Sequence, residues 1–184
     1  HTTGVVIDDP RRPYVAVANH ESFADIFLLS HLPWEMKWLS KDAIFRIPVM
    51  GWMMRMAGDI RVVRHSRQSR AGALDQIRDR LDKRVSVMIL PEGTRSPTGE
   101  LLPFKDGAFR VAIERQLPVL PIAVAGTRNA MARHSLRFNP ARAIARVLEP
   151  IPTEGLTQDD VPALRDRVRS LIDHARSELL RELS

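Results

Sequence analysis

The sequence contains no cysteine, few aromatic residues and no long apolar run, and each absence excludes a class of protein. Without cysteine among its 184 residues, the chain has no disulfide, no thiolate metal site and no cysteine nucleophile. No apolar stretch approaches the roughly 20 residues that a membrane-spanning helix needs. Aromatic residues make up only 5%, which argues against a base-stacking surface for nucleic acid. With 44% hydrophobic and 27% charged residues, the composition is that of an ordinary globular domain.

Acidic residues are also fewer than basic ones. The chain has 22 Asp and Glu against 28 Lys and Arg, a formal charge of +6. This excess favours an anionic partner, whether a nucleic acid, a phosphorylated substrate or an acidic bilayer surface. The sequence begins with His1 rather than methionine. We therefore expect residues 1–184 to form a single domain that lacks an N-terminal membrane-associated segment.

Segments with the hydrophobic periods of strands and helices alternate along the chain. The expected strands are residues 14–18, 36–39, 60–63, 85–90 and 119–125. The expected helices are residues 23–32, 48–58, 66–84, 107–115 and 161–183. Residues 142–148, in which apolar and polar side chains alternate, are predicted to form a less buried edge strand. The alternation predicts an α/β fold, with a mostly parallel central sheet flanked by helices in one domain and with sites at the carboxyl ends of the strands.

A histidine and an aspartate follow the first expected strand. His20 and Asp25 are five residues apart, so in a continuous helix they would be rotated by about 140° and could not pair. With His20 in the strand-to-helix turn, Asp25 can reach its Nδ1 and leave Nε2 free as a proton acceptor. This arrangement predicts a general base that deprotonates a substrate hydroxyl, with Ser22 capping the helix. The alternative is that both residues only stabilise the start of a helix.

Further polar residues follow the third and fourth expected strands. In the segment "PEGTRS", Gly93 permits close backbone approach and Arg95 offers a planar fork for phosphate oxygens. Arg64 ends the third strand, and Arg64, Arg95 and Lys105 together favour an anionic substrate that bears a hydroxyl group. The alternative is a surface loop with an ion pair between Glu92 and Arg95. No nucleotide-binding glycine motif and no H-E-x-x-H pattern occurs, so we expect no nucleotide site and no metal site.

In this order the motifs resemble those of the glycerolipid acyltransferase family, specifically the 1-acylglycerol-3-phosphate (lysophosphatidate) acyltransferases. The four family motifs stand here as "NHESFAD", "GDIRVVR", "LPEGTRS" and "LPVLPIAVAG", which cover most of residues 15–130. The resemblance implies a glycerol-3-phosphate acyltransferase-like fold, with His20 as general base and Asp25 as its orienting partner. It also implies the residues that hold the glycerol phosphate of the acceptor: Arg64, Glu92, Gly93, Thr94 and Arg95.

The reaction that the resemblance implies needs no metal or redox cofactor. The free sn-2 hydroxyl of lysophosphatidate attacks the thioester of acyl-CoA or acyl carrier protein, which yields phosphatidate. One departure concerns the second motif, where Val63 replaces a common acidic residue and Arg61 occupies a usually apolar position. Another lysolipid or glycerol-3-phosphate therefore remains an alternative acceptor. Further alternatives are an inactive acyltransferase scaffold and a non-catalytic basic module that binds anions or nucleic acid.

Aromatic residues and methionines gather with cations between the first two motifs. The apolar members are Trp34, Trp38, Phe45, Met50, Trp52, Met53, Met54 and Met56, and the basic members are Lys37, Lys41, Arg46 and Arg55. Such a mixture is typical of a surface that contacts lipid head groups. We expect association with a membrane surface at its cytoplasmic face, together with an apolar acyl groove and no nucleic-acid partner. The alternative is that most of these side chains belong to the core.

Overall fold

The computed structural model describes residues 1–7, 9, 11–63, 65–131 and 137–184. At its centre is a seven-stranded sheet with the order β1-β7-β6-β2-β5-β3-β4. The strands are β1 (Thr2–Gly4), β2 (Val15–Ala18), β3 (Met36–Lys41), β4 (Ile60–Val62), β5 (Ser86–Ile89), β6 (Val119–Ala125) and β7 (Ile144–Val147). All neighbouring strands are parallel except β6 and β7. The predicted α/β class with a mostly parallel sheet is confirmed.

Seven α-helices and one short 3-10 helix are present among the described residues. The helices are α1 (Ala24–Leu29), α2 (Asp42–Phe45), α3 (Met50–Ala57), α4 (Arg67–Asp82), α5 (Gly107–Glu114), α6 (Thr127–Ala130) and α7 (Val161–Leu183), and the 3-10 helix is Gln158–Asp160. β1, α2 and α6, each three or four residues long, were not predicted from the sequence. None of the described helices combines the length and the apolarity needed to cross a bilayer.

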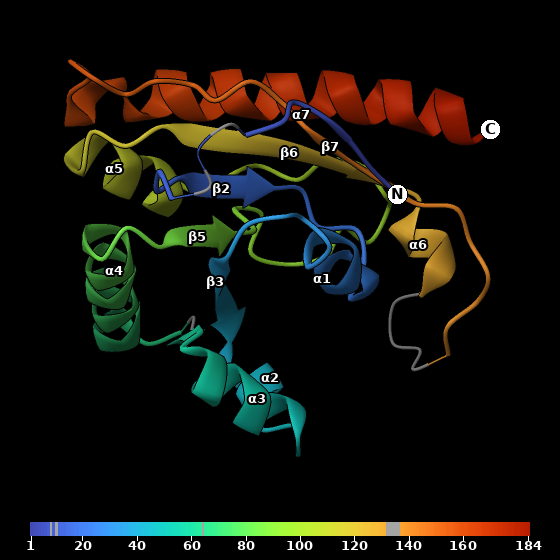
Figure 1. Cartoon of the computed structure of the whole chain (residues 1–184), viewed down its shortest axis with the longest axis horizontal. Coiled ribbons are helices and arrows are strands. Elements are labelled where there is room, and N and C mark those ends of the chain that lie inside the picture. The colour runs from blue at the N-terminus through green and yellow to red at the C-terminus, as the bar shows by residue number, and fades with distance from the viewer. Residues whose placement is uncertain (8, 10, 64, 132–136) are drawn as a thin grey trace.

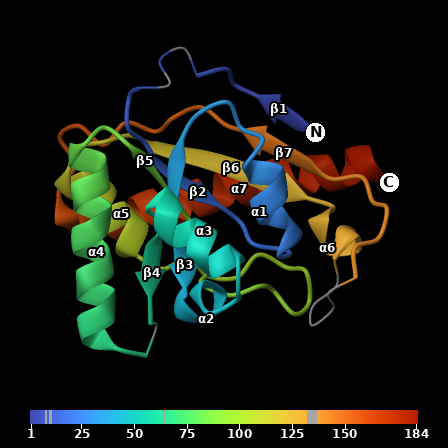
Figure 2. The ribbon, with the colours of Figure 1, turned by 60° about the horizontal axis from the view of Figure 1, so that its bottom comes forward.

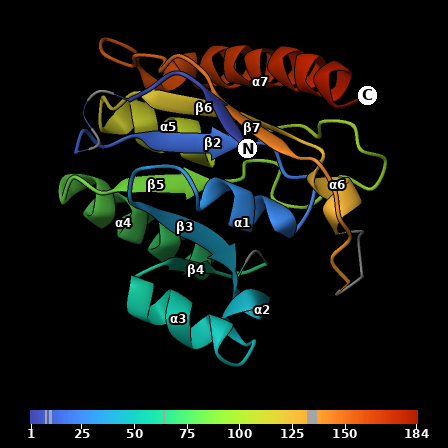
Figure 3. The same cartoon turned by 45° about the vertical axis from the view of Figure 1, so that its right-hand side comes forward.

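Helices cover both faces of the sheet, so its central strands are buried on both sides (Figures 1 and 2). Val15 and Val17 of β2 pack with side chains of α4, α5 and α7. The alternate residues Ala16 and Ala18 face the opposite side, where they join Leu29 of α1. This two-sided burial explains why the central strands are continuously apolar rather than alternating. In Figures 1 and 3, α2 and α3 lie at the end of the molecule opposite α7.

The prediction of an edge strand at residues 142–148 was wrong. The strand exists as β7, but it lies between β6 and β1, and Ala145 is fully buried. Its polar position is Arg146, whose guanidinium pairs with Glu178 and Glu182 of α7. The alternation in this segment therefore marks contact with the charged side of a helix instead of an open sheet edge.

Candidate active site

The residues of the candidate active site follow the carboxyl ends of three adjacent strands. β2 pairs with β5 on one side and with β6 on the other. His20 follows β2, the segment of residues 91–95 follows β5, and Thr127 follows β6. Because these strands are parallel, the chain leaves all three on the same side of the sheet (Figure 3). Polar side chains from distant parts of the sequence meet there.

His20 and Asp25 form the predicted pair. His20 Nδ1 lies 2.8 Å from Asp25 Oδ2, and the Asp25 side chain is fully buried while 16% of the His20 side chain is exposed. Asp25 Oδ2 also accepts the backbone N–H groups of Glu21 and Ser22 at 2.9 and 3.0 Å. Asp25 Oδ1 accepts the hydroxyl of Thr127. Both oxygens of the carboxylate are thus held by hydrogen bonds, and the carboxylate fixes the imidazole through Nδ1. The Nε2 atom of the ring does not take part in this contact.

Two polar residues of the first motif join β2 to the far side of the site. The Asn19 side chain donates to Val124 O at 2.9 Å and accepts from Val124 N at 2.7 Å. The Ser22 hydroxyl donates to Met131 O at 2.7 Å and accepts from Ala24 N at 3.3 Å. Ser22 is not the cap residue that the sequence predicts, since Phe23 precedes the first residue of α1, and its shorter bond ties the motif to the segment after β6. Sequence analysis assigned no role to Asn19 or Thr127, although each is a polar residue at the end of an apolar strand.

Glu92 supports the turn that carries His20. Its side chain is buried, and its two oxygens accept the backbone N–H groups of His20 at 2.7 Å and Leu102 at 2.9 Å. Burial raises the pKa of the Glu92 carboxyl, and these two hydrogen bonds oppose that rise. Glu92 is not among the residues that line the cavity beside His20. The contacts of Glu92 in the structure are thus with the backbone of the site, and its implied contact with substrate stays a prediction.

A cavity of about 650 Å³ opens beside His20. Four other predicted site residues line it with His20: Gly93, Thr94, Arg95 and Lys105. The rest of the lining is largely apolar and includes Phe23, Ile26, Leu39, Ile44, Leu74 and Ile77. The cavity thus combines the His20 imidazole and four cationic side chains, those of Lys41, Arg70, Arg95 and Lys105, with a largely apolar wall. Arg64, the remaining predicted cation, lies outside the described residues.

Gly93 lets the ammonium group of Lys105 approach the backbone. Gly93 has φ of 71°, and a Cβ on this residue would lie 2.7 Å from Lys105 Nζ. A side chain here would therefore be strained and would also displace the lysine. In the structure the group that approaches Gly93 closely is Lys105, and approach by a substrate stays a prediction.

An ion pair links the turn that contains His20 to α7. Glu21 Oε1 accepts Arg176 Nε at 2.8 Å, and Oε2 accepts Gly126 N at 3.1 Å. The same guanidinium donates to Gly99 O in the loop after β5. Burial raises the pKa of Glu21, and Arg176 opposes the rise. Sequence analysis missed this pair because 155 residues separate its members.

The unusual residues of the second motif lie away from the cavity. Arg61 and Val63 are not among its lining residues. Arg61 instead pairs with Asp42 at 3.2 Å, and its side chain is 57% exposed. The described residues contain no group of three His, Asp or Glu side chains that could hold a metal ion.

Comparisons with known proteins agree with this geometry. Residues 6–125 match the Acyltransferase family. The chain is 36% identical over 177 residues to the human 1-acyl-sn-glycerol-3-phosphate acyltransferase alpha, covering 95% of this chain and 61% of that protein. It is 35% identical over 163 residues to the Saccharomyces cerevisiae 1-acyl-sn-glycerol-3-phosphate acyltransferase, covering 86% of this chain and 54% of that protein. The chain thus spans little more than half to three fifths of these relatives.

A solved structure has the same architecture. The crystal structure of the 1-acyl-sn-glycerophosphate acyltransferase PlsC from Thermotoga maritima superposes with a TM-score of 0.79 and 27% sequence identity. The match covers 96% of this chain and 72% of that one. The similarity therefore extends over nearly the whole sheet and its helices.

Proposed function

The chain belongs to the acyltransferase family, and from this premise we propose that it transfers a fatty acyl group to the sn-2 hydroxyl of lysophosphatidate. The product would be phosphatidate, the acyl donor acyl-CoA or acyl carrier protein, and no metal or redox cofactor would take part. The observation that carries the proposal is the His20–Asp25 pair beside a cavity that holds Arg95, Lys105 and an apolar wall. Relatives that are 36% and 35% identical to the chain are named 1-acyl-sn-glycerol-3-phosphate acyltransferases.

In the proposed reaction His20 acts as general base. Nε2 removes the proton from the acceptor hydroxyl while the oxygen attacks the thioester carbonyl carbon. The carbon–sulfur bond then breaks, and the leaving thiolate takes the proton from the imidazolium. Asp25 stabilises the positive charge that His20 carries between these steps. No covalent enzyme intermediate is needed, since base and acceptor act on the donor directly.

Arg95 and Lys105 would hold the phosphate of the acceptor, with Gly93 and Thr94 beside them. A guanidinium and an ammonium group suit phosphate oxygens, and the partly enclosed cavity strengthens such contacts relative to water. We keep Arg64 in this proposed set from its place in the second motif. Because Arg61 and Val63 lie outside the cavity lining, the unusual second motif gives no reason to prefer another lysolipid or glycerol-3-phosphate as acceptor.

We also propose that the chain, as a single acyltransferase domain, works at the cytoplasmic face of a membrane. Acceptor and product are both membrane lipids, so an enzyme that acts on them gains from residing at the lipid surface. Family membership favours this function over the alternative of a nucleic-acid-binding module. No nucleic acid is part of the proposal.

The decisive experiment measures acyl transfer by wild type, His20→Ala and the control His174→Ala. His174 is an exposed histidine on α7, with 75% of its side chain accessible. We expect His20→Ala to lower turnover roughly 10²–10⁴-fold, the usual contribution of a general base, and His174→Ala to be neutral. Each protein is assayed with lysophosphatidate, other lysophospholipids and glycerol-3-phosphate, against acyl-CoA and acyl carrier protein donors. Transfer that His20→Ala leaves unchanged would refute the proposed role.

A further inference from the structure

An exposed apolar face on α3 adjoins a cationic pocket that is separate from the catalytic cavity. The exposed residues are Val49, Trp52, Met53 and Met56, whose exposed fractions lie between 59% and 69%. Trp52, Met53 and Met56, spaced three and four residues apart, lie on one side of α3, and Val49 directly precedes the helix. Among the described residues of α3, only Gly51 is buried.

The structure explains why this face points outward. A Cβ on Gly51 would overlap Phe45 O, so α3 packs on α2 with its backbone in direct contact. Arg55, one helical turn further, donates to the same carbonyl at 2.8 Å. Gly51 and Arg55 are therefore on the side that faces α2, and the apolar residues are on the other. No described element besides α2 packs extensively against α3.

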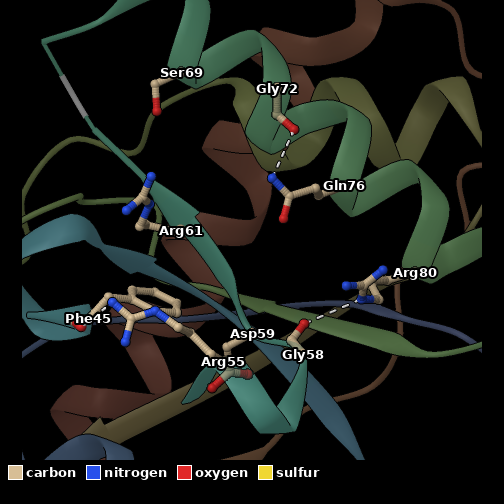
Figure 4. Close-up of a pocket in the computed structure, with 9 residues that line it drawn as sticks. All are labelled: Phe45, Arg55, Gly58, Asp59, Arg61, Ser69, Gly72, Gln76 and Arg80. Atoms are coloured by element: carbon tan, nitrogen blue, oxygen red, sulfur yellow. Dashed lines mark hydrogen bonds between the residues drawn. The ribbon is translucent and has the colours of Figure 1, made fainter. Parts of the chain in front are cut away.

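The pocket lies between the α2–α3 pair and α4. Its volume is about 420 Å³, and its lining includes three arginines but a single acidic residue: Arg55, Arg61, Arg80 and Asp59. The hydroxyl of Ser69 and the amide of Gln76 complete the polar lining, and Figure 4 shows these side chains around one hollow. Guanidinium, hydroxyl and amide donors together are suited to the oxygens of a phosphate.

Each arginine keeps donors available although each has a partner in the protein. Arg55 uses one N–H group on Phe45 O, Arg61 pairs with Asp42, and Arg80 contacts Gly58 O and Asp79. A guanidinium has five N–H donors, so these contacts hold the side chains in place and leave others for a ligand. The Asp59 carboxylate accepts the backbone N–H of Trp38 at 2.9 Å.

We propose that α3 docks on an anionic bilayer, with Val49, Trp52, Met53 and Met56 among the acyl chains and a phospholipid phosphate in the pocket of Arg55, Arg61 and Arg80. Charge complementarity selects this occupant, because a helix that exposes apolar residues and also carries Arg55 into a pocket with two further arginines matches a bilayer surface with anionic head groups. The docking itself does not depend on the proposed function, and only its consequence for catalysis rests on that function. Ile44 of α2 lines the catalytic cavity and Phe45 of α2 lines the pocket, so docking here brings the cavity to the lipid surface.

Vesicle co-sedimentation tests both parts of the inference on the 184-residue chain. The vesicles contain phosphatidylcholine alone or phosphatidylcholine with phosphatidylglycerol. The face variant carries Trp52→Ser, Met53→Ser and Met56→Ser, and the pocket variant carries Arg55→Gln, Arg61→Gln and Arg80→Gln. Matched controls on exposed residues elsewhere are Leu171→Ser with Leu180→Ser, and Arg12→Gln with Arg110→Gln and Arg181→Gln. Circular dichroism verifies that every variant is folded.

We expect the pocket variant to bind anionic vesicles roughly a hundredfold less tightly, at about one kcal/mol for each basic residue near the surface. The control with three arginines replaced should bind anionic vesicles less than tenfold more weakly than wild type. The face variant should bind both kinds of vesicle at least about tenfold more weakly. Free inorganic phosphate at millimolar concentration should compete poorly, because it lacks the apolar part of the contact.

Four outcomes would overturn the inference. Wild-type binding by the face variant would remove α3 from the contact, and equal losses in the pocket variant and its control would reduce the pocket to general charge. Full competition by free phosphate would make the pocket a site for a soluble anion. Self-association that the face variant abolishes, without vesicle binding, would assign the face to a second copy. Failure of the proposed function is distinguishable, since vesicle binding does not require acyl transfer.

Discussion

At the scale of single residues, the active site depends on how one carboxylate is held. Three donors converge on Asp25 Oδ2: His20 Nδ1 and the backbone N–H groups of Glu21 and Ser22. The opposite oxygen faces a hydroxyl, that of Thr127. A hydroxyl can turn to accept a hydrogen bond, but a backbone N–H cannot. The sites of the two carboxylate oxygens are therefore not equivalent when the side chain is replaced by an amide.

This asymmetry predicts the result of Asp25→Asn. The amide oxygen should occupy the Oδ2 position and the NH₂ group should face Thr127, so the His20 tautomer is retained while the negative charge is lost. Turnover should fall roughly a hundredfold because the imidazolium is less stabilised, and the free energy of unfolding should fall by about 1–2 kcal/mol. Asp59→Asn, which removes another carboxylate bonded to a backbone N–H, is the matched control. Turnover near that of wild type would exclude the charge as the working feature of Asp25.

Glu92→Gln should change how the stability of the fold depends on pH, because it replaces a buried carboxyl group with a group that does not titrate. Burial raises the Glu92 pKa above its ordinary value of 4.5, so the folded protein binds this proton more tightly than the unfolded chain. The stability conferred by that proton is fully present below pH 4.5 and is lost as pH rises through the folded-state pKa. Since glutamine does not titrate, the stability of the variant relative to wild type should rise across this interval and then stay level. Urea unfolding between about pH 4 and 8 measures it, and a difference that does not change with pH would contradict the assignment.

At the scale of elements, α7 holds the segments that carry the site. Three arginines of α7 reach the loop between β5 and α5 or its end: Arg165 pairs with Asp106, Arg169 donates to the carbonyls of residues 101 and 102, and Arg176 donates to Gly99 O. Arg176 also pairs with Glu21, next to His20. The long amphipathic helix that the sequence predicts therefore has a polar side with structural contacts as well as a buried apolar side.

Arg176→Ala should destabilise the fold and lower turnover. The substitution leaves Glu21 buried without its partner, and breaking such a pair typically costs about 3 kcal/mol. Because the Glu21–Arg176 side chains are only 7% and 12% exposed, solvent screens the pair little. Arg181→Ala, an exposed position on the same helix, should change the free energy of unfolding by less than about 0.5 kcal/mol. Urea unfolding and acyl transfer are measured on both proteins.

A second substitution separates charge from packing in this prediction. Adding Glu21→Gln to Arg176→Ala removes the unpaired charge, so part of the lost stability should return. If the double variant is less stable than Arg176→Ala alone, the loss arises from packing of the arginine and not from the stranded carboxylate.

At the scale of the whole molecule, basic side chains differ in how far neighbouring acidic residues cancel their charge. The net charge of +6 includes arginines paired with acidic residues, such as Arg78 with Glu114 and Arg146 with Glu178, whose fields are partly cancelled. In the pocket beside α3, Arg61 and Arg80 also have acidic partners, but three guanidinium groups line one hollow. Long-range attraction to an anionic surface and local head-group binding should therefore act together on the same side of the molecule.

Binding to anionic vesicles should accordingly depend on salt. The Debye length shortens from about 10 Å at 0.1 M salt to about 3 Å at 1 M. Salt therefore removes the long-range attraction but not the apolar contact of α3. Raising NaCl across this range should weaken binding to vesicles with phosphatidylglycerol at least about tenfold. Binding to pure phosphatidylcholine should change little. Co-sedimentation over a salt series checks this, and equal salt dependence on both vesicles would argue against charge as the cause.

The sequence by itself determined the class of the fold and predicted the residues of the candidate site. The alternation of strand and helix periods predicts the mostly parallel sheet, His20, Asp25, Gly93, Thr94 and Arg95 stand in the motifs, and Lys105 was predicted as a further cation near them. These features are local, since a hydrophobic period reports burial within one element and a motif spans a few residues. The contact between His20 and Asp25 is of this kind, because only five residues separate them.

Only the tertiary structure decided which strands are neighbours and which way α3 faces. The order that places β2 between β5 and β6 brings Glu92 to His20 across 72 residues, Thr127 to Asp25 across 102 and Arg176 to Glu21 across 155. The sequence predicted a lipid-contacting surface for this segment and left a core position as the alternative; the structure exposes Trp52, Met53 and Met56 and buries Phe45, with Gly51 of α3 in contact with α2. Such contacts leave no local pattern in the chain, because the packing of separate elements selects them.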